Sequence, residues 1–185
     1  AAGFWKAWKI LSNSRHTRSL FLKKFGTDNS LETKTEVFHV GLPKESYLYR
    51  IEEDAEPRTD PVQRFVTVSR LNNSRKNIDG VIEAVADIIQ KDGYPVTYTV
   101  VGDGRQKEKL VQLAKELGVS DMVKFTGSID RESLNAHLLR SDLFILAPRN
   151  TEGDVEGFGI VYLEANGCGI PVLASRDSGP EDAVL

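Results

Sequence analysis

The chain has 185 residues, of which 40% are hydrophobic and 28% are charged. This composition is typical of a globular protein with a core of its own and unlike that of a disordered chain. The net charge of −3 argues against a nucleic-acid partner, because such proteins usually present a basic face. The single cysteine, Cys168, excludes an internal disulfide and fits a reducing compartment such as the cytoplasm. No apolar run reaches the length of about eighteen residues that a membrane-spanning helix needs.

The first ten residues, Ala1–Ile10, contain both tryptophans of the chain, Trp5 and Trp8, together with two lysines. One interpretation is an amphipathic segment that lies on a membrane surface, which would make the protein peripheral at the inner membrane. The other is a short helix that packs on a neighbouring domain. We favour the second interpretation, because two lysines are too few for a polybasic anchor.

The residues before position 44 have the pattern of an incomplete domain. They predict a strand at Lys9–Ser12, a helix at Arg15–Phe25 and a strand at Thr35–Val40. These elements are too few to bury a core, so we interpret residues 1–43 as the remnant of a neighbouring domain. Residues 44–62 are rich in charge and proline, which is typical of a linker.

From residue 63 onward, short β-rich runs alternate with amphipathic helical stretches. The expected strands are Arg64–Ser69, Val96–Val101, Met122–Thr126, Leu143–Ala147 and Ile170–Ala174. The expected helices are Asn77–Gln90, Lys107–Leu117, Arg131–Arg140 and Phe158–Asn166, with the start of another at Gly179–Asp182. This alternation predicts a Rossmann-like α/β domain with a doubly wound parallel sheet over residues 63–185. Because the last helix has barely begun, we expect the domain to be truncated at its C-terminus.

The loop Arg70–Asn77 follows the first expected strand of this domain and precedes a helix. In open α/β sheets, ligands bind at the carboxyl edge of the strands, where this loop lies. The loop has three cations, Arg70, Arg75 and Lys76, within seven residues, which suits a bound diphosphate. The same composition also fits a solvated loop at the start of a helix.

Gly102 and Gly104 follow the second expected strand and have two interpretations. They can form a phosphate-binding turn, or a tight turn between strand and helix that needs positive φ angles. Lys107 stands where a dinucleotide-binding fingerprint has its third glycine, so NAD binding is disfavoured. We favour the tight turn.

Two glutamates, Glu156 and Glu164, are separated by seven residues near the last long helix. Eight positions span a little over two helical turns, so both side chains are expected near one face of the helix. At a helix N-terminus, Glu156 can accept hydrogen bonds from hydroxyl groups that lie beside bound phosphates. A helix cap at Glu156 and a solvated surface residue at Glu164 account for the spacing equally well.

No pattern for a metal site or a covalent nucleophile is present. His16, His39 and His137 are scattered, without metal-ligand spacing to each other or to a cysteine. Cys168 and Ser175 lack the context of a nucleophile elbow. We assign these residues structural roles.

Taken in order, the motifs between Phe65 and Val184 resemble the C-terminal, donor-binding domain of the family-four retaining glycosyltransferases, which have the GT-B fold. The motifs are V-S-R-L with the later K-N, V-V-G-D-G, F-T-G-S-I, E-G-F-G with the later glutamate, G-C-G-I-P-V-L-A-S and the final G-P-E. The run Asp154–Ala165, with Ala147–Arg149 before it, is most similar to phosphatidylinositol mannosyltransferase-type members, which use GDP-mannose. Ile10–Pro43 resembles the end of the family's acceptor-side domain.

The resemblance implies a domain that binds a nucleotide sugar, either GDP-mannose or a UDP-sugar, for transfer of the hexose to a glycan or lipid acceptor. It implies catalytic roles for Arg70 and Lys76, which would hold the donor diphosphate, and for Glu156, which would hold the sugar hydroxyls. Glu164 would accept hydrogen bonds from the ribose. The implied backbone contacts to the donor are at Gly102, Gly104, Ile129, Gly157, Phe158 and Gly159. A metal is not needed in this family.

The sequence departs from the family pattern at Gly179–Pro180, where a Gly-Gly pair is common, and at Cys168. The family's glycine-rich acceptor-side loop and its sugar-facing histidine are absent, so this chain alone is expected to bind donor without transferring it. The implied partners are therefore the N-terminal domain and an acceptor lipid at a membrane surface. Two alternative functions are a sugar-nucleotide epimerase of the same architecture and a regulatory nucleotide-binding module.

Overall fold

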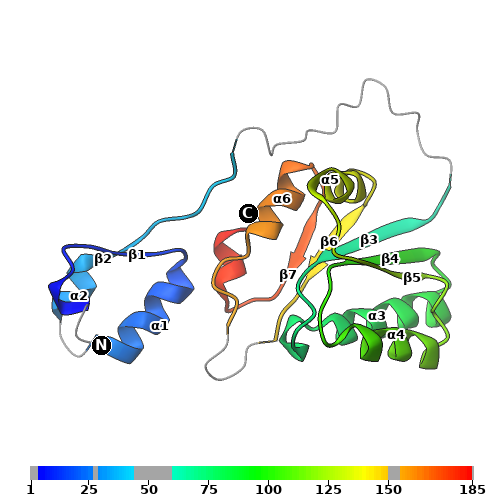
Figure 1. Cartoon of the computed structure of the whole chain (residues 1–185), viewed down its shortest axis with the longest axis horizontal. Coiled ribbons are helices and arrows are strands. Elements are labelled where there is room, and N and C mark those ends of the chain that lie inside the picture. The colour runs from blue at the N-terminus through cyan, green and yellow to red at the C-terminus, as the bar shows by residue number, and fades with distance from the viewer. Residues whose placement is uncertain (1–3, 27–28, 44–59, 150–154, 185) are drawn as a thin grey trace.

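The computed structural model describes residues 4–26, 29–43, 60–149 and 155–184, and it has a small N-terminal unit beside a larger α/β domain (Figure 1). Most of the expected linker, residues 44–59, lies outside the described residues. No helix in the part of the chain that the structure describes is long and apolar enough to cross a membrane.

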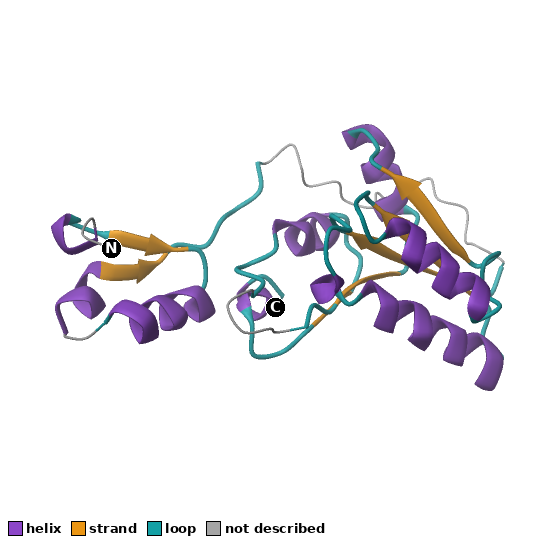
Figure 2. Cartoon of the chain, turned by 60° about the horizontal axis from the view of Figure 1, so that its bottom comes forward, coloured by secondary structure: helices purple, strands orange, loops and turns teal. Residues whose placement is uncertain are grey.

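The N-terminal unit pairs two short strands and places its two α-helices on the same side of them (Figure 2). Its elements are η1 (Phe4–Lys6), β1 (Ile10–Ser12), α1 (Arg15–Phe25), α2 (Asn29–Lys34) and β2 (Thr35–Val37). The strands are parallel, with Ile10 opposite Thr35. Ser14 caps α1 through a hydrogen bond from the Thr17 backbone N–H to its side chain, which explains why the helix begins at the predicted residue.

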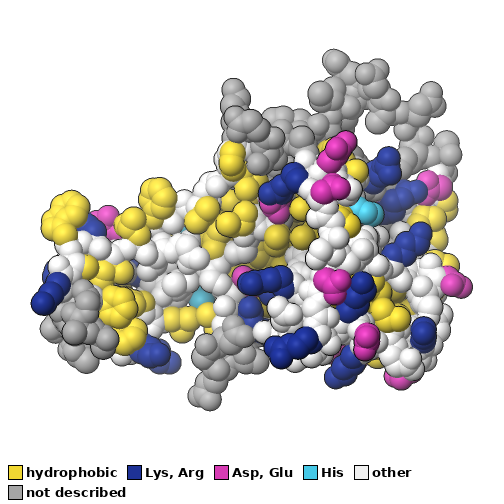
Figure 3. Space-filling view, viewed as in Figure 1, with side chains coloured by type: hydrophobic (Ala, Val, Ile, Leu, Met, Phe, Trp, Pro, Cys, Tyr) yellow, Lys and Arg dark blue, Asp and Glu magenta, His cyan; other side chains and the backbone are white. Residues whose placement is uncertain are grey.

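Hydrophobic side chains gather on the surface of this unit (Figure 3). Phe4, Phe21 and Phe25 pack against one another with ring centroids 5.1 to 5.3 Å apart. Trp8 is 85% exposed, and Leu11 is exposed as well. A contiguous apolar surface of this kind usually contacts a partner.

The α/β domain is built on one parallel sheet. Its strands are β3 (Gln63–Val68), β4 (Val96–Val101), β5 (Val123–Gly127), β6 (Leu143–Leu146) and β7 (Val172–Ala174). Its helices are η4 (Ser74–Lys76), α3 (Ile78–Lys91), α4 (Lys107–Glu116), α5 (Arg131–Leu139), α6 (Ile160–Gly167) and η5 (Gly179–Asp182). The spatial order is β5-β4-β3-β6-β7, with α3 and α4 on one face and α5 and α6 on the other (Figure 1). The predicted Rossmann-like, doubly wound sheet is confirmed.

The core lies between the sheet and these two helical layers. Tyr98 and Phe144 are fully buried in the strands, and Tyr162 is fully buried on α6. The Tyr98 hydroxyl lies 2.7 Å from Thr67 Oγ1, which satisfies two polar groups inside the core. The strongly apolar face of α3 covers the sheet as its helical periodicity predicts.

Every predicted element of this domain agrees with the structure within two residues at both ends, whereas the short helix η4, inside the predicted loop Arg70–Asn77, was not predicted. One difference changes the interpretation of the site. The helix α6 begins at Ile160 rather than at Phe158, because Gly159 has a φ of +84° and turns the chain sharply into the helix. Glu156 therefore lies in the extended segment before the helix and is not its cap.

Candidate functional site

A cavity of about 420 Å³ opens at the carboxyl edge of the sheet. It lies where β3 and β6 are neighbours and the connections leave the sheet in opposite directions. Val68, Val101 and Leu146, the last residues of three strands, form part of its wall. Such a switch point is where open α/β sheets bind their ligands.

Six of the ten predicted site residues line this cavity: Arg70, Lys76, Gly102, Ile129, Glu156 and Gly159. They come from the loops after β3, β4 and β5 and from the segment before α6. The structure therefore brings both predicted cations and the predicted sugar-binding carboxylate to one cavity, although more than eighty positions separate Arg70 from Glu156 in the sequence.

Glu156 forms an ion pair with Lys76 across the cavity wall. Its carboxylate also lies 3.5 Å from Nη1 of Arg75, a residue to which the sequence analysis gave no separate role. The Glu156 and Lys76 side chains are only 15% and 17% exposed, so water screens their charges weakly. Arg70, in contrast, is exposed, and in the described residues its side chain takes part in no ion pair.

Tyr162 lies next to the cluster formed by Glu156, Lys76 and Arg75. Its hydroxyl donates a hydrogen bond to the Leu146 carbonyl oxygen at 2.8 Å. Burial, and then the neighbouring Glu156 charge, raise the pKa of Tyr162 far above its ordinary value, against the opposing effect of Arg75. The phenol therefore stays neutral at physiological pH and holds the end of β6 beneath the site.

Glu164 lies outside the lining of the cavity, on the side of α6 that faces α5. Its carboxylate accepts a hydrogen bond from Nη1 of Arg131 at 2.6 Å, and its side chain is 11% exposed. The alternative of a solvated surface residue is therefore wrong. The sequence analysis missed Arg131, because no local pattern connects two residues 33 positions apart.

Gly102 and Gly104 hold two loops together at the edge of the cavity. Their φ angles are +135° and +151°, which confirms the tight turn. A Cβ atom on Gly102 would lie 1.9 Å from the carbonyl oxygen of Ser69. Gly104 packs in the same way on Leu71, and it does not reach the cavity as a donor contact requires.

Replacing Gly102 by alanine should lower the free energy of unfolding by roughly 3 kcal/mol or more, because backbone strain and a steric clash add. Gly93→Ala is the matched control: its φ is +70°, but no atom lies within 4 Å of the new Cβ. The control should cost only about 1 kcal/mol. Urea denaturation of both variants measures the difference, and equal losses would show that the contact with Ser69 is unimportant.

Gly157 and Phe158 face the N-terminal unit rather than the cavity. The Thr17 hydroxyl donates a hydrogen bond to the Gly157 carbonyl oxygen at 3.2 Å. The buried ring of Phe158 stacks on His39, with centroids 5.8 Å apart. The Gly157 carbonyl and the Phe158 ring therefore point away from the cavity, and the sequence analysis missed the role of His39.

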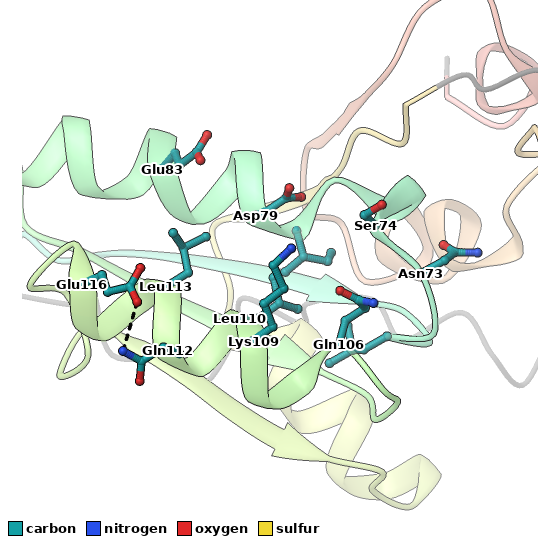
Figure 4. Close-up of a pocket in the computed structure, with 12 residues that line it drawn as sticks. Asn73, Ser74, Asp79, Glu83, Gln106, Lys109, Leu110, Gln112, Leu113 and Glu116 are labelled. Carbon is teal, nitrogen blue, oxygen red and sulfur yellow. Dashed lines mark hydrogen bonds between the residues drawn. The ribbon is translucent and has the colours of Figure 1, made fainter.

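A second cavity, of about 320 Å³, lies between α3 and α4 (Figure 4). Asp79 and Glu83 project from α3 and Glu116 from α4, whereas Lys109 is the only lysine or arginine among the described residues that line it. Arg149 pairs with Asp79 at 2.9 Å, which leaves two glutamates against one lysine, a balance that disfavours phosphate groups. The switch-point cavity, with Arg70 and Lys76, is therefore the candidate site for a diphosphate. Within the described residues, no cluster of His, Cys, Asp and Glu side chains is placed to hold a metal ion.

A doubly wound parallel sheet with a cavity at its switch point places the chain in the class of Rossmann-like domains. The chain belongs to the family of glycosyl transferases group 1, whose match spans residues 50–185. The resemblance inferred from the motifs is confirmed.

Two curated relatives support the same assignment. The chain is 38% identical over 184 residues to the GDP-mannose-dependent alpha-(1-6)-phosphatidylinositol monomannoside mannosyltransferase of Mycolicibacterium smegmatis, covering 93% of this chain and 45% of the relative. It is 36% identical over 183 residues to the protein of that name from Mycobacterium tuberculosis, covering 92% and 44%. The chain thus spans less than half the length of these relatives.

Solved structures of other glycosyltransferases share the fold. The apo form of the lipopolysaccharide outer core galactosyltransferase WaaB superposes with a TM-score of 0.75 at 21% identity, covering 97% of this chain and 46% of that one. Sucrose-phosphate synthase from Thermosynechococcus elongatus superposes with a TM-score of 0.76 at 23% identity, covering 100% and 44%. The GT-B fold class is therefore confirmed.

Proposed function

We propose that this chain is the donor-binding half of a retaining hexosyltransferase that transfers mannose from GDP-mannose to a glycan or lipid acceptor. The observation that carries the proposal is the convergence of Arg70, Lys76 and Glu156 on the switch-point cavity. The printed names of the curated relatives favour GDP-mannose over a UDP-sugar. The epimerase and the non-catalytic module are not favoured by these comparisons.

In the proposed reaction, the bond between the anomeric carbon of the sugar and an oxygen of the diphosphate breaks, and its electron pair leaves with that oxygen. An acceptor hydroxyl oxygen forms the new bond to the anomeric carbon, and the proton of that hydroxyl passes to the departing diphosphate oxygen. Arg70 and Lys76 stabilise the negative charge that develops on the diphosphate. Two cationic side chains neutralise phosphate oxygens as a divalent metal does elsewhere, so the proposal includes no metal and no cofactor.

Glu156 accepts hydrogen bonds from the donor-sugar hydroxyls in this proposal. Its ion pair with Lys76 supports the assignment, because an incoming diphosphate competes for Lys76 and frees a carboxylate oxygen for the sugar. The backbone N–H groups of Phe158 and Gly159, which follow Glu156 in the chain, help it to hold the sugar in this proposal. For Glu164 to accept hydrogen bonds from the ribose, as the family resemblance implies, its carboxylate has to turn from Arg131 toward the cavity when the donor binds, because it does not line the cavity in this structure. The backbone near Gly102 and Ile129 borders the base.

We also propose that residues 1–43 belong to the acceptor-side domain and that the remaining part of that domain covers their apolar surface. The exposed Trp8 and Leu11 support this proposal. In this proposal, the partners of the whole protein are the nucleotide sugar and an acceptor lipid, and the protein acts at the cytoplasmic face of the inner membrane.

The proposed function is tested with the full-length protein, labelled GDP-mannose and labelled UDP-glucose. A transferase moves the label onto an acceptor in a membrane-lipid extract. An epimerase converts the sugar nucleotide without any acceptor, and a regulatory module binds it without turnover. Either of these last outcomes would overturn the proposal.

Replacing Glu164 by glutamine should weaken the binding of GDP and of GDP-mannose equally, by about 1–3 kcal/mol, because a charged hydrogen bond to the ribose is lost. Calorimetric titration of both ligands measures the effect. Glu108→Gln, at an exposed position of α4, is the control and should bind as the wild type does. Unchanged affinity in the Glu164 variant would remove this residue from the donor site.

A further inference from the structure

Besides the Thr17–Gly157 and His39–Phe158 contacts, the N-terminal unit contacts the α/β domain through the carboxylate of Asp182. One oxygen of Asp182 accepts a hydrogen bond from the backbone N–H of Arg15 at 2.5 Å, and the other accepts one from Arg15 Nε at 2.5 Å. His39 Nε2 lies 3.2 Å from the first of these oxygens. Arg15 begins α1, and His39 follows β2, so one side chain on η5 holds both segments of the N-terminal unit. The start of α1 and η5 are neighbours in both ribbon views (Figures 1 and 2).

This contact is continuous with the segment that carries Glu156. His39, held by Asp182, stacks on Phe158 with ring planes 22° apart. On the other side, the backbone N–H of Gly179, at the start of η5, donates a hydrogen bond to the Glu156 carbonyl oxygen at 3.0 Å. A Cβ atom on Gly179 would lie 2.0 Å from the Gly157 carbonyl oxygen, so the two segments are in tight contact. The Glu156–Phe158 segment is thus clamped between η5 and the N-terminal unit.

The two charged side chains of this contact, Asp182 and Arg15, differ in burial. The Asp182 side chain is only 4% exposed, whereas the Arg15 side chain is 75% exposed. A buried carboxylate that loses its cation is strongly unfavourable, so Asp182 favours the arrangement in which the two units touch. Burial tends to raise the pKa of Asp182, but the hydrogen bonds from Arg15 and His39 outweigh it and hold the pKa below its ordinary value. The carboxylate therefore stays charged at neutral pH.

We propose that Asp182 is a positioning residue for sugar transfer: through Arg15 and His39 it fixes the Glu156–Phe158 segment against the acceptor-side unit. The inference rests on the proposed function, because it assumes that Glu156 holds the donor sugar. Asp182 touches neither diphosphate nor nucleoside in this scheme, since it does not line the cavity. It sets the position of the sugar relative to the acceptor side, on which the rate of a bimolecular transfer depends steeply.

The test uses Asp182→Asn in the full-length protein, with kcat, donor KM and GDP affinity measured separately. Because the diphosphate contacts are untouched, GDP affinity should stay within about twofold of the wild type, whereas kcat should fall roughly tenfold or more. Intact GDP binding also shows that the variant is folded. Glu181→Gln is the control on the same turn, because its exposed side chain accepts only a local hydrogen bond from the Asp177 backbone.

Arg15→Gln disrupts the same ion pair by changing its other member. If both residues act through it, the Asp182→Asn, Arg15→Gln double variant should lose no more kcat than the worse single variant. Wild-type kcat in Asp182→Asn, additive losses in the double variant, or a parallel loss of GDP affinity would each overturn the inference. Failure of the proposed function is recognised separately, because the unmodified full-length protein would then transfer no sugar.

Discussion

Replacing Glu156 by glutamine should separate recognition of the sugar from recognition of the nucleotide. The affinity for GDP should stay the same or rise, because the loss of the Glu156 charge frees Lys76 for the diphosphate. The affinity for GDP-mannose should fall by about 1.5–3 kcal/mol, the scale of a hydrogen bond to a charged group. In the full-length enzyme kcat should fall further, because these hydrogen bonds orient the reacting carbon.

Calorimetric titration of both ligands against the wild type and the variant measures this difference. Glu83→Gln is a matched control, because Glu83 is a carboxylate of the cavity between α3 and α4. Equal losses for GDP and GDP-mannose, or no loss for either, would contradict a sugar-binding role for Glu156. A variant that loses only stability would indicate that the carboxylate serves to neutralise Lys76 and Arg75.

Lys76→Ala should weaken GDP and GDP-mannose by the same factor, because both ligands contain the diphosphate. The expected loss is about 1.5–3 kcal/mol, or roughly tenfold to more than a hundredfold in Kd. Among the described residues, removal of Lys76 leaves Glu156 with Arg75 as its ion-pair partner at 3.5 Å, which adds repulsion between the carboxylate and the phosphates. Fluorescence or calorimetric titration measures the change.

Lys91→Ala provides the control for Lys76. Lys91 is at the other end of α3, where its exposed side chain pairs with Asp87 at 2.8 Å. This variant should bind both ligands as the wild type does. If Lys76→Ala bound GDP with wild-type affinity, the diphosphate would have to be held by other residues.

The strands and helices of the α/β domain were predictable because their signals are local. The apolar spacing of α3 and the β-rich run of β4 each indicate one type of element within a short stretch. The start of α6 was predicted two residues early, since a single glycine with positive φ leaves little trace in a periodicity. The helix α2 was missed because its six residues are shorter than two turns.

The candidate site was predictable where its residues adjoin the ends of strands. Arg70 and Lys76 lie in the connection after β3 and Gly102 follows β4, and the carboxyl ends of parallel strands meet at one edge. The tertiary ion pairs were not predictable in this way. Arg15 and Asp182 are 167 positions apart, and only the folded chain brings them together.

The crystal structure of this chain with bound GDP-mannose tests the central claim most directly. The account predicts that the diphosphate lies in the switch-point cavity, within hydrogen-bond distance of both Arg70 and Lys76, with the mannose beside Glu156. A ligand in the cavity between α3 and α4, or a diphosphate that contacts neither cation, would contradict it.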